Sequence, residues 1–503
     1  MANSTLVDAP PAREVAPQSN PHHAQRWTVL GVLAIAQLMV VLDATVVNIA
    51  LPTAQTALHF SNNDRQWIVT AYALAFGSLL LLGGRIADLI GRKRTFLIGL
   101  AGFAAASALG GAATSFGMLV TARAVQGAFG AVLAPAALAL LTTTFTESRE
   151  RARAFGIYGA IAGAGAAIGL LLGGVLTEFA SWRWTMFVNL IFAGAALIGG
   201  FLFLHHRPSE DRPKLDLPGT LTVSGGLFAL VYGFSHAETA GWASSVTIGF
   251  LVVAVVLLTA FVVLQAKGTH PLLPLRIVLD RNRGGAYFAM FTAAVGMFGI
   301  FLFLTYYLQQ ILGYSALRTG VAFLPMVAML VLSSSVVSTA LATRVSPRIL
   351  VPSGLGLAAV GMFLLTGLTD HSSYTSEVMP ATMVSGLGMG MIFASAMSLA
   401  TLGVAADDAG VGSAAVNTAQ QVGGSIGTAL LNTIAATAAT SYVASHVTAS
   451  GVSATVLRQA AVHSYVVAFW WSAAIFAGGA LVSALLLRSG VPQPDDSQEL
   501  VLV

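Results

Sequence analysis

The chain contains no cysteine and very little charge. The absence of cysteine among its 503 residues excludes disulfide bonds, thiolate nucleophiles and cysteine-ligated metals. Charged residues make up 9% of the chain, whereas a soluble domain carries about 25%. Because 56% of the residues are hydrophobic, the chain lacks the polar surface to face water on all sides. The composition therefore indicates a membrane protein.

Several kinds of functional motif are also missing from the sequence. No GxxxxGK[ST] loop is present, so nucleotide hydrolysis is not available as an energy source. No nucleophile, base and orienting residue recur together in the apolar segments, metal ligands do not cluster, and no nucleic-acid module is found. We therefore expect no enzyme, no bound metal or cofactor and no nucleic-acid partner.

Long apolar segments fill most of the chain. About 20 apolar residues cross the hydrocarbon core of a bilayer, which is roughly 30 Å thick. Cutting the sequence at its polar breaks predicts fourteen membrane-spanning helices. They are residues 28–51, 66–84, 95–115, 117–144, 154–177, 184–204, 217–235, 245–266, 285–309, 319–343, 349–369, 378–403, 411–438 and 464–487.

The positive charges test this partition, because cytoplasmic loops of membrane proteins collect Lys and Arg. With a cytoplasmic N-terminus, nineteen of the 24 Lys and Arg residues fall on the cytoplasmic side. The outer loops hold only Arg65, Arg183, Arg318 and Arg458. The sequence therefore predicts a multi-pass protein of the cell membrane with both termini in the cytoplasm.

Polar breaks divide the spans into groups of six, two and six. The breaks are residues 205–216 and 267–283. Two groups of six favour a duplicated half, as in many secondary transporters. The expected domains are a disordered cytoplasmic tail (1–26), an N-terminal six-helix bundle (27–204), a linker with two additional helices (205–284), a C-terminal six-helix bundle (285–488) and a cytoplasmic tail (489–503).

Only two full charges, Asp43 and Arg123, lie within the fourteen predicted spans. A charge at the bilayer centre costs at least about 2.5 kcal/mol, so such residues are few and usually functional. Both lie at roughly 10 Å from the outer face at about 1.5 Å per residue, and they could share one pocket. Burial disfavours the charged form of a carboxylate and a guanidinium favours it, so such a pair can couple proton binding to movement. The alternative is a permanent ion pair that locks two helices together.

A second motif lies in the turn between the second and third predicted spans. Residues 84–94 read GRIADLIGRKR, with glycines for a tight turn and basic residues that can pair with Asp88 at the membrane face. An ordinary hairpin whose basic residues only set orientation would have similar charge. The detailed spacing, however, resembles the GxLaDrxGRkxxl signature of the major facilitator superfamily.

Other stretches resemble the fourteen-helix drug:proton antiporters of that superfamily. Residues 42–52 (LDATVVNIALP) are similar to the LDxTVVNvALP signature, and residues 123–127 (RAVQG) are similar to the RxxQG element of helix four. The resemblance also includes residues 181–184, 308–325 and 417–427. It implies an all-α integral membrane protein with the major facilitator fold, in which fourteen helices form two pseudo-symmetric six-helix bundles plus two inserted helices.

The resemblance also implies roles for individual residues. Asp43 is expected to carry the coupled proton, with Arg123 as its partner. The expected cytoplasmic gate consists of Gly84, Asp88, Gly91 and Arg92. Thr45, Asn48 and Gln126 are polar neighbours on the same two helices, for which hydrogen bonding in the pocket and plain packing are both open.

The fifth predicted span contains a glycine stripe but no charge. Gly165, Gly169 and Gly173, followed by Gly174, match the small-xxx-small pattern that lets helices approach closely. The antiporters resembled here carry GxxxGPxxGG in this helix, whereas this chain has Leu170 at the proline position. Since proline bends a helix, the stripe is retained but the kink is not.

The function implied by the resemblance is proton-coupled export of amphipathic organic compounds such as drugs, dyes or antibiotics. The proton gradient would supply the energy, and Gln37, Asn417 and Gln421 are candidates for the wall of the substrate cavity. We expect a monomer whose partners are the substrate, protons and the lipid bilayer. The alternatives are export of an endogenous metabolite or lipid, and a transporter-like receptor that no longer transports.

Overall fold

The computed structural model describes residues 25–61, 64–145, 148–204, 216–268, 271, 273, 275–341, 344–401, 409–446 and 453–490. Within these ranges the regular structure is helical and contains no strand. The first six helices are α1 (Arg26–Leu58), α2 (Gln66–Ile90), α3 (Arg92–Gly111), α4 (Phe116–Thr144), α5 (Ser148–Phe179) and α6 (Trp184–Phe203). Next come α7 (Leu217–Ala240), α8 (Ser245–Lys267) and the short α9 (Leu275–Val278).

The remaining helices include three single π-helical turns, labelled η. They are α10 (Arg281–Tyr306), η1 (Tyr307–Ile311), α11 (Ala316–Ala322), α12 (Leu324–Val336), η2 (Val337–Leu341), α13 (Pro347–Leu365), η3 (Tyr374–Val378), α14 (Met379–Thr401), α15 (Ala409–His446) and α16 (Ala454–Leu486).

Twelve of the helical segments within the described residues are long and apolar enough to cross a membrane. α2 and α5 add shorter apolar stretches, Gln66–Leu80 and Ile168–Phe179. Because a bilayer core offers no water to exposed backbone groups, helices that satisfy their own hydrogen bonds suit it. The structure thus shows a multi-pass, all-helical protein, and the count of fourteen spans stays a prediction.

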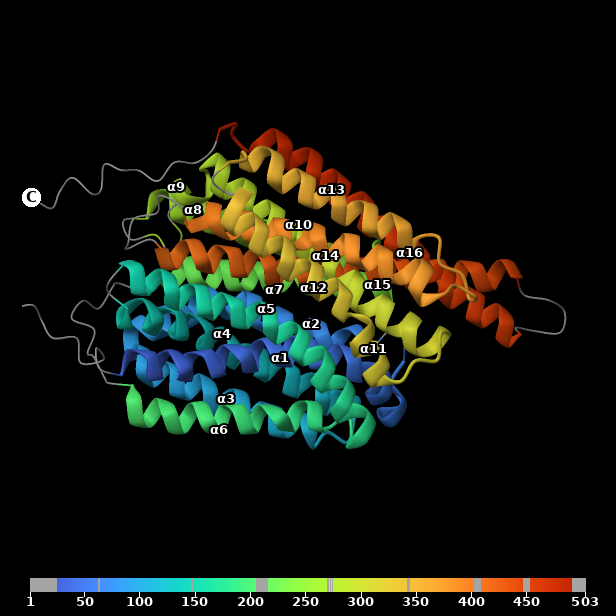
Figure 1. Cartoon of the computed structure of the whole chain (residues 1–503), viewed down its shortest axis with the longest axis horizontal. Helices are drawn as coiled ribbons and strands as arrows, with labels where there is room; N and C mark the ends of the chain where they lie inside the picture. Colours follow the sequence, from blue (N-terminus) through green and yellow to red (C-terminus); the bar gives the residue numbers. More distant parts are fainter. Residues whose placement is uncertain are drawn as a thin grey trace, which may run out of the picture.

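The long helices lie side by side in two groups (Figure 1). α1 to α6 pack on one another, and α10 to α16 do the same. Phenylalanines such as Phe96 and Phe103 fill the core of the first group, and Phe303, Phe469 and Phe476 that of the second. The two ends of the molecule are named the Arg26 end and the Leu58 end, after the residues at which α1 begins and ends.

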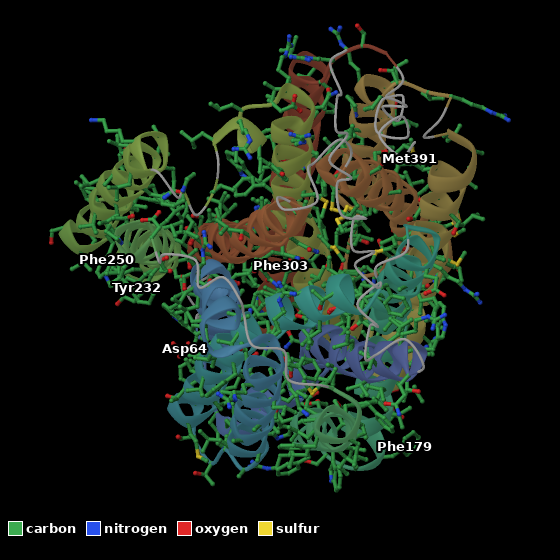
Figure 2. The ribbon with its side chains drawn as sticks, turned by 90° about the vertical axis from the view of Figure 1, so that its left-hand side faces the viewer. Asp64, Phe179, Tyr232, Phe250, Phe303 and Met391 are labelled. Atoms are coloured by element: carbon green, nitrogen blue, oxygen red, sulfur yellow. The ribbon has the colours of Figure 1, made fainter. Side chains whose placement is uncertain are left out.

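α7 and α8 pack against each other and lie beside the two groups. Figure 2, a view along the helices, places their labelled side chains Tyr232 and Phe250 at one flank of the molecule. α7 contacts α2 from the first group and α15 from the second. The buried cluster there joins Leu74 of α2, Val223 and Leu227 of α7, and Val422 of α15. The pair therefore covers one side of the seam between the groups.

Several hydrogen bonds join the two groups toward the Leu58 end. Tyr306 Oη donates to Gln55 Oε1 at 2.7 Å, and Gln309 Nε2 donates to the Ile49 carbonyl at 3.1 Å. The Leu317 amide donates to Glu178 Oε2 at 3.0 Å. These contacts close the seam at the Leu58 end.

Some helices differ in length from the sequence prediction. α1 continues to Leu58, seven residues beyond the predicted end at residue 51, so Asp43 lies near the middle of the helix. α16 begins at Ala454 rather than at residue 464, which places Arg458 in a helix instead of a loop. Helical hydrogen bonding continues past the apolar run in both cases, because the backbone does not need apolar side chains to remain helical.

Candidate functional site

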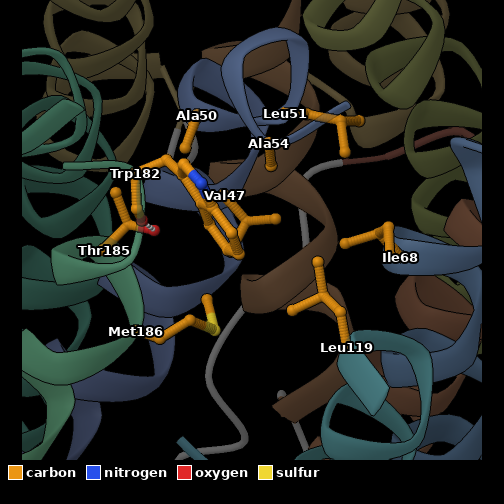
Figure 3. A pocket seen from close by; sticks show the side chains of 9 residues that line it. All are labelled: Val47, Ala50, Leu51, Ala54, Ile68, Leu119, Trp182, Thr185 and Met186. Atoms are coloured by element: carbon orange, nitrogen blue, oxygen red, sulfur yellow. Dashed lines mark hydrogen bonds between the residues drawn. The ribbon is translucent and has the colours of Figure 1, made fainter. Parts of the chain in front are cut away.

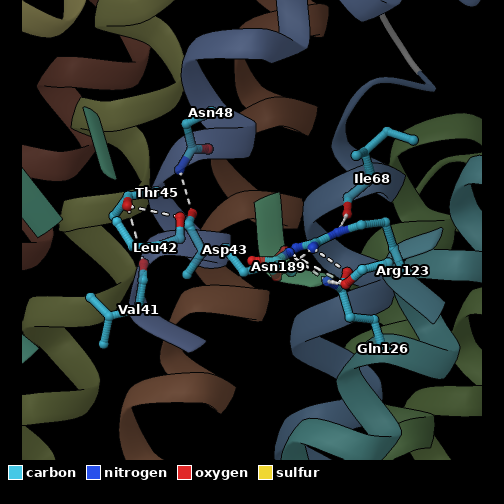
Figure 4. A network of polar contacts seen from close by, with 11 residues as sticks. Val41, Leu42, Asp43, Thr45, Asn48, Ile68, Arg123, Gln126 and Asn189 are labelled. Atoms are coloured by element: carbon cyan, nitrogen blue, oxygen red, sulfur yellow. Dashed lines mark hydrogen bonds and ion pairs between the residues drawn. The ribbon is translucent and has the colours of Figure 1, made fainter. Parts of the chain in front are cut away.

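A buried polar network connects four helices of the first group (Figure 4). It contains Asp43 from α1, Ser107 from α3, Arg123 and Gln126 from α4, and Asn189 from α6. Arg123 is 2% exposed, and the other four residues are 0% exposed. The network is therefore closed to bulk solvent in this conformation.

Arg123 is held from three sides. Its Nη1 donates to Asp43 Oδ2 at 2.6 Å and to Gln126 Oε1 at 2.6 Å. Its Nε donates to the carbonyl of Ile68 in the first turn of α2 at 3.1 Å. The guanidinium carbon lies 4.3 Å from the centre of the Tyr72 ring, within cation–π range. The sequence-predicted pair of charges is thus in direct contact.

Asp43 accepts hydrogen bonds on both carboxylate oxygens. Oδ2 receives the Arg123 bond, while Oδ1 receives Gln126 Nε2 at 2.7 Å and Asn189 Nδ2 at 2.8 Å. Ser107 Oγ accepts from both amides, at 2.7 Å from Gln126 and 3.3 Å from Asn189. Two buried charges are costly to desolvate even when they are paired, so this network is weak evidence for a purely stabilising role.

Two small cavities lie near the network, and Arg123 lines one of them. The first, of about 10 Å³, lies toward the Leu58 end and is lined by apolar groups such as Val47, Leu119 and Trp182 (Figure 3). The second, of about 30 Å³, lies between Tyr72, Arg123 and Gln421 of α15. The lining of both cavities is mostly apolar, and neither can hold a drug-sized molecule. Arg123 thus faces the seam between the two groups.

Thr45 and Asn48 bond to their own helix rather than to the charged pair. Thr45 Oγ1 donates to the carbonyls of Val41 and Leu42, both at 3.1 Å. Asn48 Nδ2 donates to the carbonyl of Ala44 at 2.9 Å. Of the three predicted pocket neighbours, only Gln126 contacts Asp43 and Arg123 in this conformation.

The glycine stripe of α5 packs closely against α1. A Cβ atom added at Gly169 would clash with Thr45 Oγ1, and one at Gly173 would lie 3.0 Å from the Val46 carbonyl oxygen. Gly165 lies against Val41 in the same way. Gly174 instead faces the second group, where an added Cβ would lie 2.6 Å from the Cα of Leu317 in α11. One stripe therefore serves both a contact within the first group and a contact across the seam.

Leu170, at the expected proline position, is fully buried in this α5 interface. Its carbonyl oxygen lies where Gly320 of α11 approaches, since a Cβ on Gly320 would be 2.5 Å from it. α5 is continuous through this position. Leucine thus allows an unbroken helix at the point where the two groups meet.

The predicted gate residues lie where α2 turns into α3, at the Arg26 end. Gly91 has φ of 92°, a conformation that glycine adopts without strain, and it ends α2. Arg92 is the first residue of α3. Gly84 lies in the last turns of α2, where a Cβ atom added to it would be 3.7 Å from Cβ of Pro135. The side chain of Asp88 lies outside what the structure describes.

The candidate cavity residues lie on two different helices. Gln37 of α1 accepts a hydrogen bond from Tyr158 Oη of α5 at 2.7 Å, so it is engaged within the first group. Asn417 and Gln421 lie on α15. Gln421 packs against Gly77 of α2 and lines the cavity beside Arg123. Gln421 therefore lies in the surroundings of the charged pair.

Sequence reasoning missed two features of this region. Asn189 is the only amide in the strongly apolar α6, and that isolation was the available signal. Arg65, expected in an outer loop, is 6% exposed and lies 4.2 Å from the centre of the Tyr306 ring of α10. Its Nη2 donates to Asn432 Oδ1 of α15 at 3.4 Å. Its burial comes from packing between the two groups, which hydropathy alone does not reveal.

Comparisons with known proteins add to this geometry. Residues 33–428 match the family described as Major Facilitator Superfamily. The chain is 46% identical to the puromycin resistance protein pur8 of Streptomyces alboniger, over 99% of this chain and 98% of that protein. It is 39% identical to the cephamycin export protein CmcT of Amycolatopsis lactamdurans, over 81% and 84% of the two chains.

Solved structures share the fold at low sequence identity. The POT family transporter PepTSo superposes with a TM-score of 0.67 at 16% identity, covering 92% of this chain and 97% of that one. A bacterial homolog of the human lysosomal transporter Spinster gives a TM-score of 0.62 at 17% identity, covering 94% and 99%. At these identities the likeness is one of fold.

Proposed function

The chain belongs to the Major Facilitator Superfamily, and on that premise we propose that it is a proton-coupled antiporter that exports amphipathic organic compounds by alternating access. The chain is a membrane transporter and not an enzyme. Proton coupling, export and the cycle of conformations are the parts that the proposal adds.

The observation that carries the proposal is the buried pair of Asp43 and Arg123. Both charges lie inside a bundle of apolar helices, where two well-packed hydrophobic residues would often be equally stable or more so. A charge retained at this cost in membrane helices points to ion or proton movement. Asp43 is the carboxylate that takes up and releases the proton, and Arg123 is the cation that competes with that proton.

Proton exchange requires a second conformation. Asp43 is 0% exposed, so a proton reaches it only when the surrounding helices part. The seam between the two groups is closed at the Leu58 end by Tyr306, Gln309 and Glu178, and separation there would open a path toward Arg123. We assign this conformation to the inward-facing member of the cycle, with the Leu58 end outside the cell.

The orientation follows from the distribution of basic residues. Arg85, Arg92, Lys93 and Arg94 lie around the turn at the Arg26 end, which the positive-inside rule assigns to the cytoplasm. In the outward-facing state, this turn, together with Gly84, Asp88 and Gly91, forms the gate that holds the two bundles together. Fourteen helices, acting as a monomer in the cell membrane, complete the proposed arrangement.

The substrate class is inferred from the relatives and from the site. Two relatives are named for puromycin resistance and cephamycin export, and another, 34% identical over 82% of this chain, is the tetracenomycin C resistance and export protein of Streptomyces glaucescens. Such compounds combine apolar rings with polar groups. We propose that this chain exports compounds of that kind from a cavity between the two groups, to which Gln421 contributes.

A transport assay in inverted membrane vesicles tests the proposal. Ethidium and puromycin are the probes, and a pH gradient that is acidic in the vesicle lumen is imposed. We expect wild-type vesicles to accumulate the probe, and we expect this accumulation to stop when the pH gradient is collapsed. Vesicles with Asp43→Asn should accumulate none. Unchanged gradient-driven uptake by Asp43→Asn would refute the assigned proton role, and a substrate panel would separate drug export from export of an endogenous metabolite.

A further inference from the structure

We propose that Asn189 is a positioning residue that hydrogen-bonds Asp43 in both of its protonation states by turning its side-chain amide. The inference rests on the proposed proton role of Asp43. Asn189 donates Nδ2 to Asp43 Oδ1 at 2.8 Å from a fully buried position on α6. It does not itself carry the proton.

The three donors to Asp43 differ in what else they can do. Arg123 has only N–H donors and cannot accept a hydrogen bond from a carboxylic acid. Gln126 has an acceptor, but its Oε1 already receives the Arg123 bond at 2.6 Å, which fixes the orientation of its amide. Asn189 Oδ1 is buried and has no hydrogen-bond partner among the described residues. Asn189 is therefore the one amide of the network that can turn without losing a bond at its acceptor.

The two states of Asp43 need opposite partners. As a carboxylate, Asp43 accepts on Oδ1, and Asn189 supplies an N–H. We assign an arriving proton to Oδ1, whose two donors are neutral amides, because the positive charge of Arg123 lies against Oδ2 and disfavours protonation there. The new O–H is a donor, and a half-turn of the Asn189 amide brings its Oδ1 to accept that bond. Gln126 Nε2 then keeps its bond to Ser107 Oγ.

This exchange of roles keeps Oδ1 of Asp43 hydrogen-bonded to Asn189 in both states, at the cost of the long 3.3 Å bond from Asn189 Nδ2 to Ser107 Oγ. A buried donor or acceptor without a partner costs about 1–3 kcal/mol. With Asn189 present, one hydrogen bond at Oδ1 is retained before and after protonation. Asn189 therefore stabilises both forms of Asp43, and it stabilises the carboxylate more strongly because that hydrogen bond is charge-assisted.

Few other titratable or charged groups face Asp43 from the helices that pack against α1. Arg123 of α4 and Tyr72 of α2 are its neighbours. Tyr158 of α5 and Tyr306 of α10 bond to other turns of α1, at Gln37 and Gln55. From α11, Arg318 lies over the ring of Tyr314, and α6 itself contains no ionisable residue. The pH response is therefore assigned to Asp43 and its own partners.

The test compares the pH dependence of ethidium transport in proteoliposomes for wild type, Asn189→Leu and Asn189→Ser. Leucine removes both hydrogen-bonding roles. Because charge-assisted hydrogen bonds are roughly twice as strong as neutral ones, the carboxylate loses more than the acid does. We expect the midpoint of the pH profile to move upward by about 0.5–1 pH unit. Serine, which can donate and accept, is expected to restore most of the wild-type midpoint.

Thr185→Val is the matched control. Thr185 lies one turn from Asn189 on α6, is also buried, and donates to the Trp182 carbonyl of its own helix at 2.5 Å rather than to Asp43. We expect its pH midpoint to equal that of wild type. An Asn189→Leu midpoint that does not move, or that moves no more than the Thr185→Val midpoint, would overturn the inference.

Infrared difference spectra of the wild-type protein provide a readout that does not depend on how the variants fold. With the side-chain carbonyl of asparagine labelled with ¹³C, lowering the pH should shift one labelled carbonyl band as Asn189 begins to accept a hydrogen bond. The shift should be absent from Asp43→Asn. A wild-type spectrum without the shifted carbonyl band refutes the turning of the Asn189 amide. Wild-type transport whose rate does not depend on the pH gradient refutes the proposed function as well.

Discussion

The molecule buries two arginines in very different surroundings. Arg123 lies within the first group of helices and is paired with a carboxylate at 2.6 Å. Arg65 lies at the seam between the groups, where its guanidinium rests on the Tyr306 ring at 4.2 Å and reaches an amide oxygen at 3.4 Å. In the part of the chain that the structure describes, no carboxylate pairs with Arg65.

The difference corresponds to what each region has to do. A short, charge-assisted network holds Arg123 and Asp43 within one group of helices, so the charge balance would stay inside that group during the proposed alternating-access cycle. A ring face and a long hydrogen bond to Asn432 can be replaced by water when the seam opens. The strong pairing lies within one group, and the weaker contacts of Arg65 lie across the seam. The two groups could therefore separate without leaving Arg123 or Asp43 unpaired.

Breaking the pair within the group should have the largest effect. Arg123→Ala leaves Asp43 buried without its cation, which costs about 3–5 kcal/mol of stability. We expect a lower thermal unfolding midpoint in detergent and no gradient-driven transport. The double variant Asp43→Leu, Arg123→Leu should regain stability but not transport. If the double variant still transported against a gradient, the pair would be a structural lock only.

Arg318→Ala is the matched control for this experiment. Arg318 also lies on a tyrosine ring, 3.8 Å from the centre of Tyr314, but its side chain is exposed. Exposed side chains away from special features usually change stability by less than about 0.5 kcal/mol. We expect wild-type transport and a nearly unchanged unfolding midpoint from this variant.

Substitutions at two glycines of the α5 stripe can distinguish contacts within the first group from contacts across the seam. Gly169→Ala places a Cβ against Thr45 within the first group, whereas Gly174→Ala places one against the backbone of Leu317 across the seam. Overpacking costs about 1–3 kcal/mol. Gly169→Ala should therefore lower the unfolding midpoint, while Gly174→Ala should favour opening at the Leu58 end. Gly31→Ala, where nothing lies within 4 Å, is the control.

Weakening the soft contact at Arg65 should have the smallest effect. A cation–π contact is worth about 1 kcal/mol, which corresponds to roughly a fivefold change in population. Because the chain has no cysteine, a single Ala435→Cys on the buried face of α15 can report opening at the Leu58 end. We expect Arg65→Ala to speed its labelling by an impermeant maleimide about threefold to tenfold. Equal labelling rates would place Arg65 outside the seal.

The sequence predicted the parts of the site that depend on rarity and spacing. Asp43 and Arg123 were identifiable because charges are scarce in apolar spans, and their contact is present in the structure. The close packing of α5 was readable from the four-residue spacing of its glycines. Both signals are local properties of single helices.

The remaining features depend on how separate helices meet. Asn189 is the only side-chain amide of α6, but the sequence does not say that it bonds Asp43 while Asn48 bonds its own backbone. Arg65 looked like a loop residue because its burial comes from α10 and α15, far away in sequence. Helix ends also depend on backbone hydrogen bonding beyond the apolar run, which is why α1 extends to Leu58.

Direct measurement of proton release tests the central claim, that Asp43 exchanges a proton during transport. Purified protein in a weakly buffered detergent solution is titrated with ethidium or puromycin while a pH indicator dye is followed. We expect the wild-type protein to release protons on binding, and Asp43→Asn to bind the same probe without release. Equal proton release by the two proteins would contradict the proton role of Asp43.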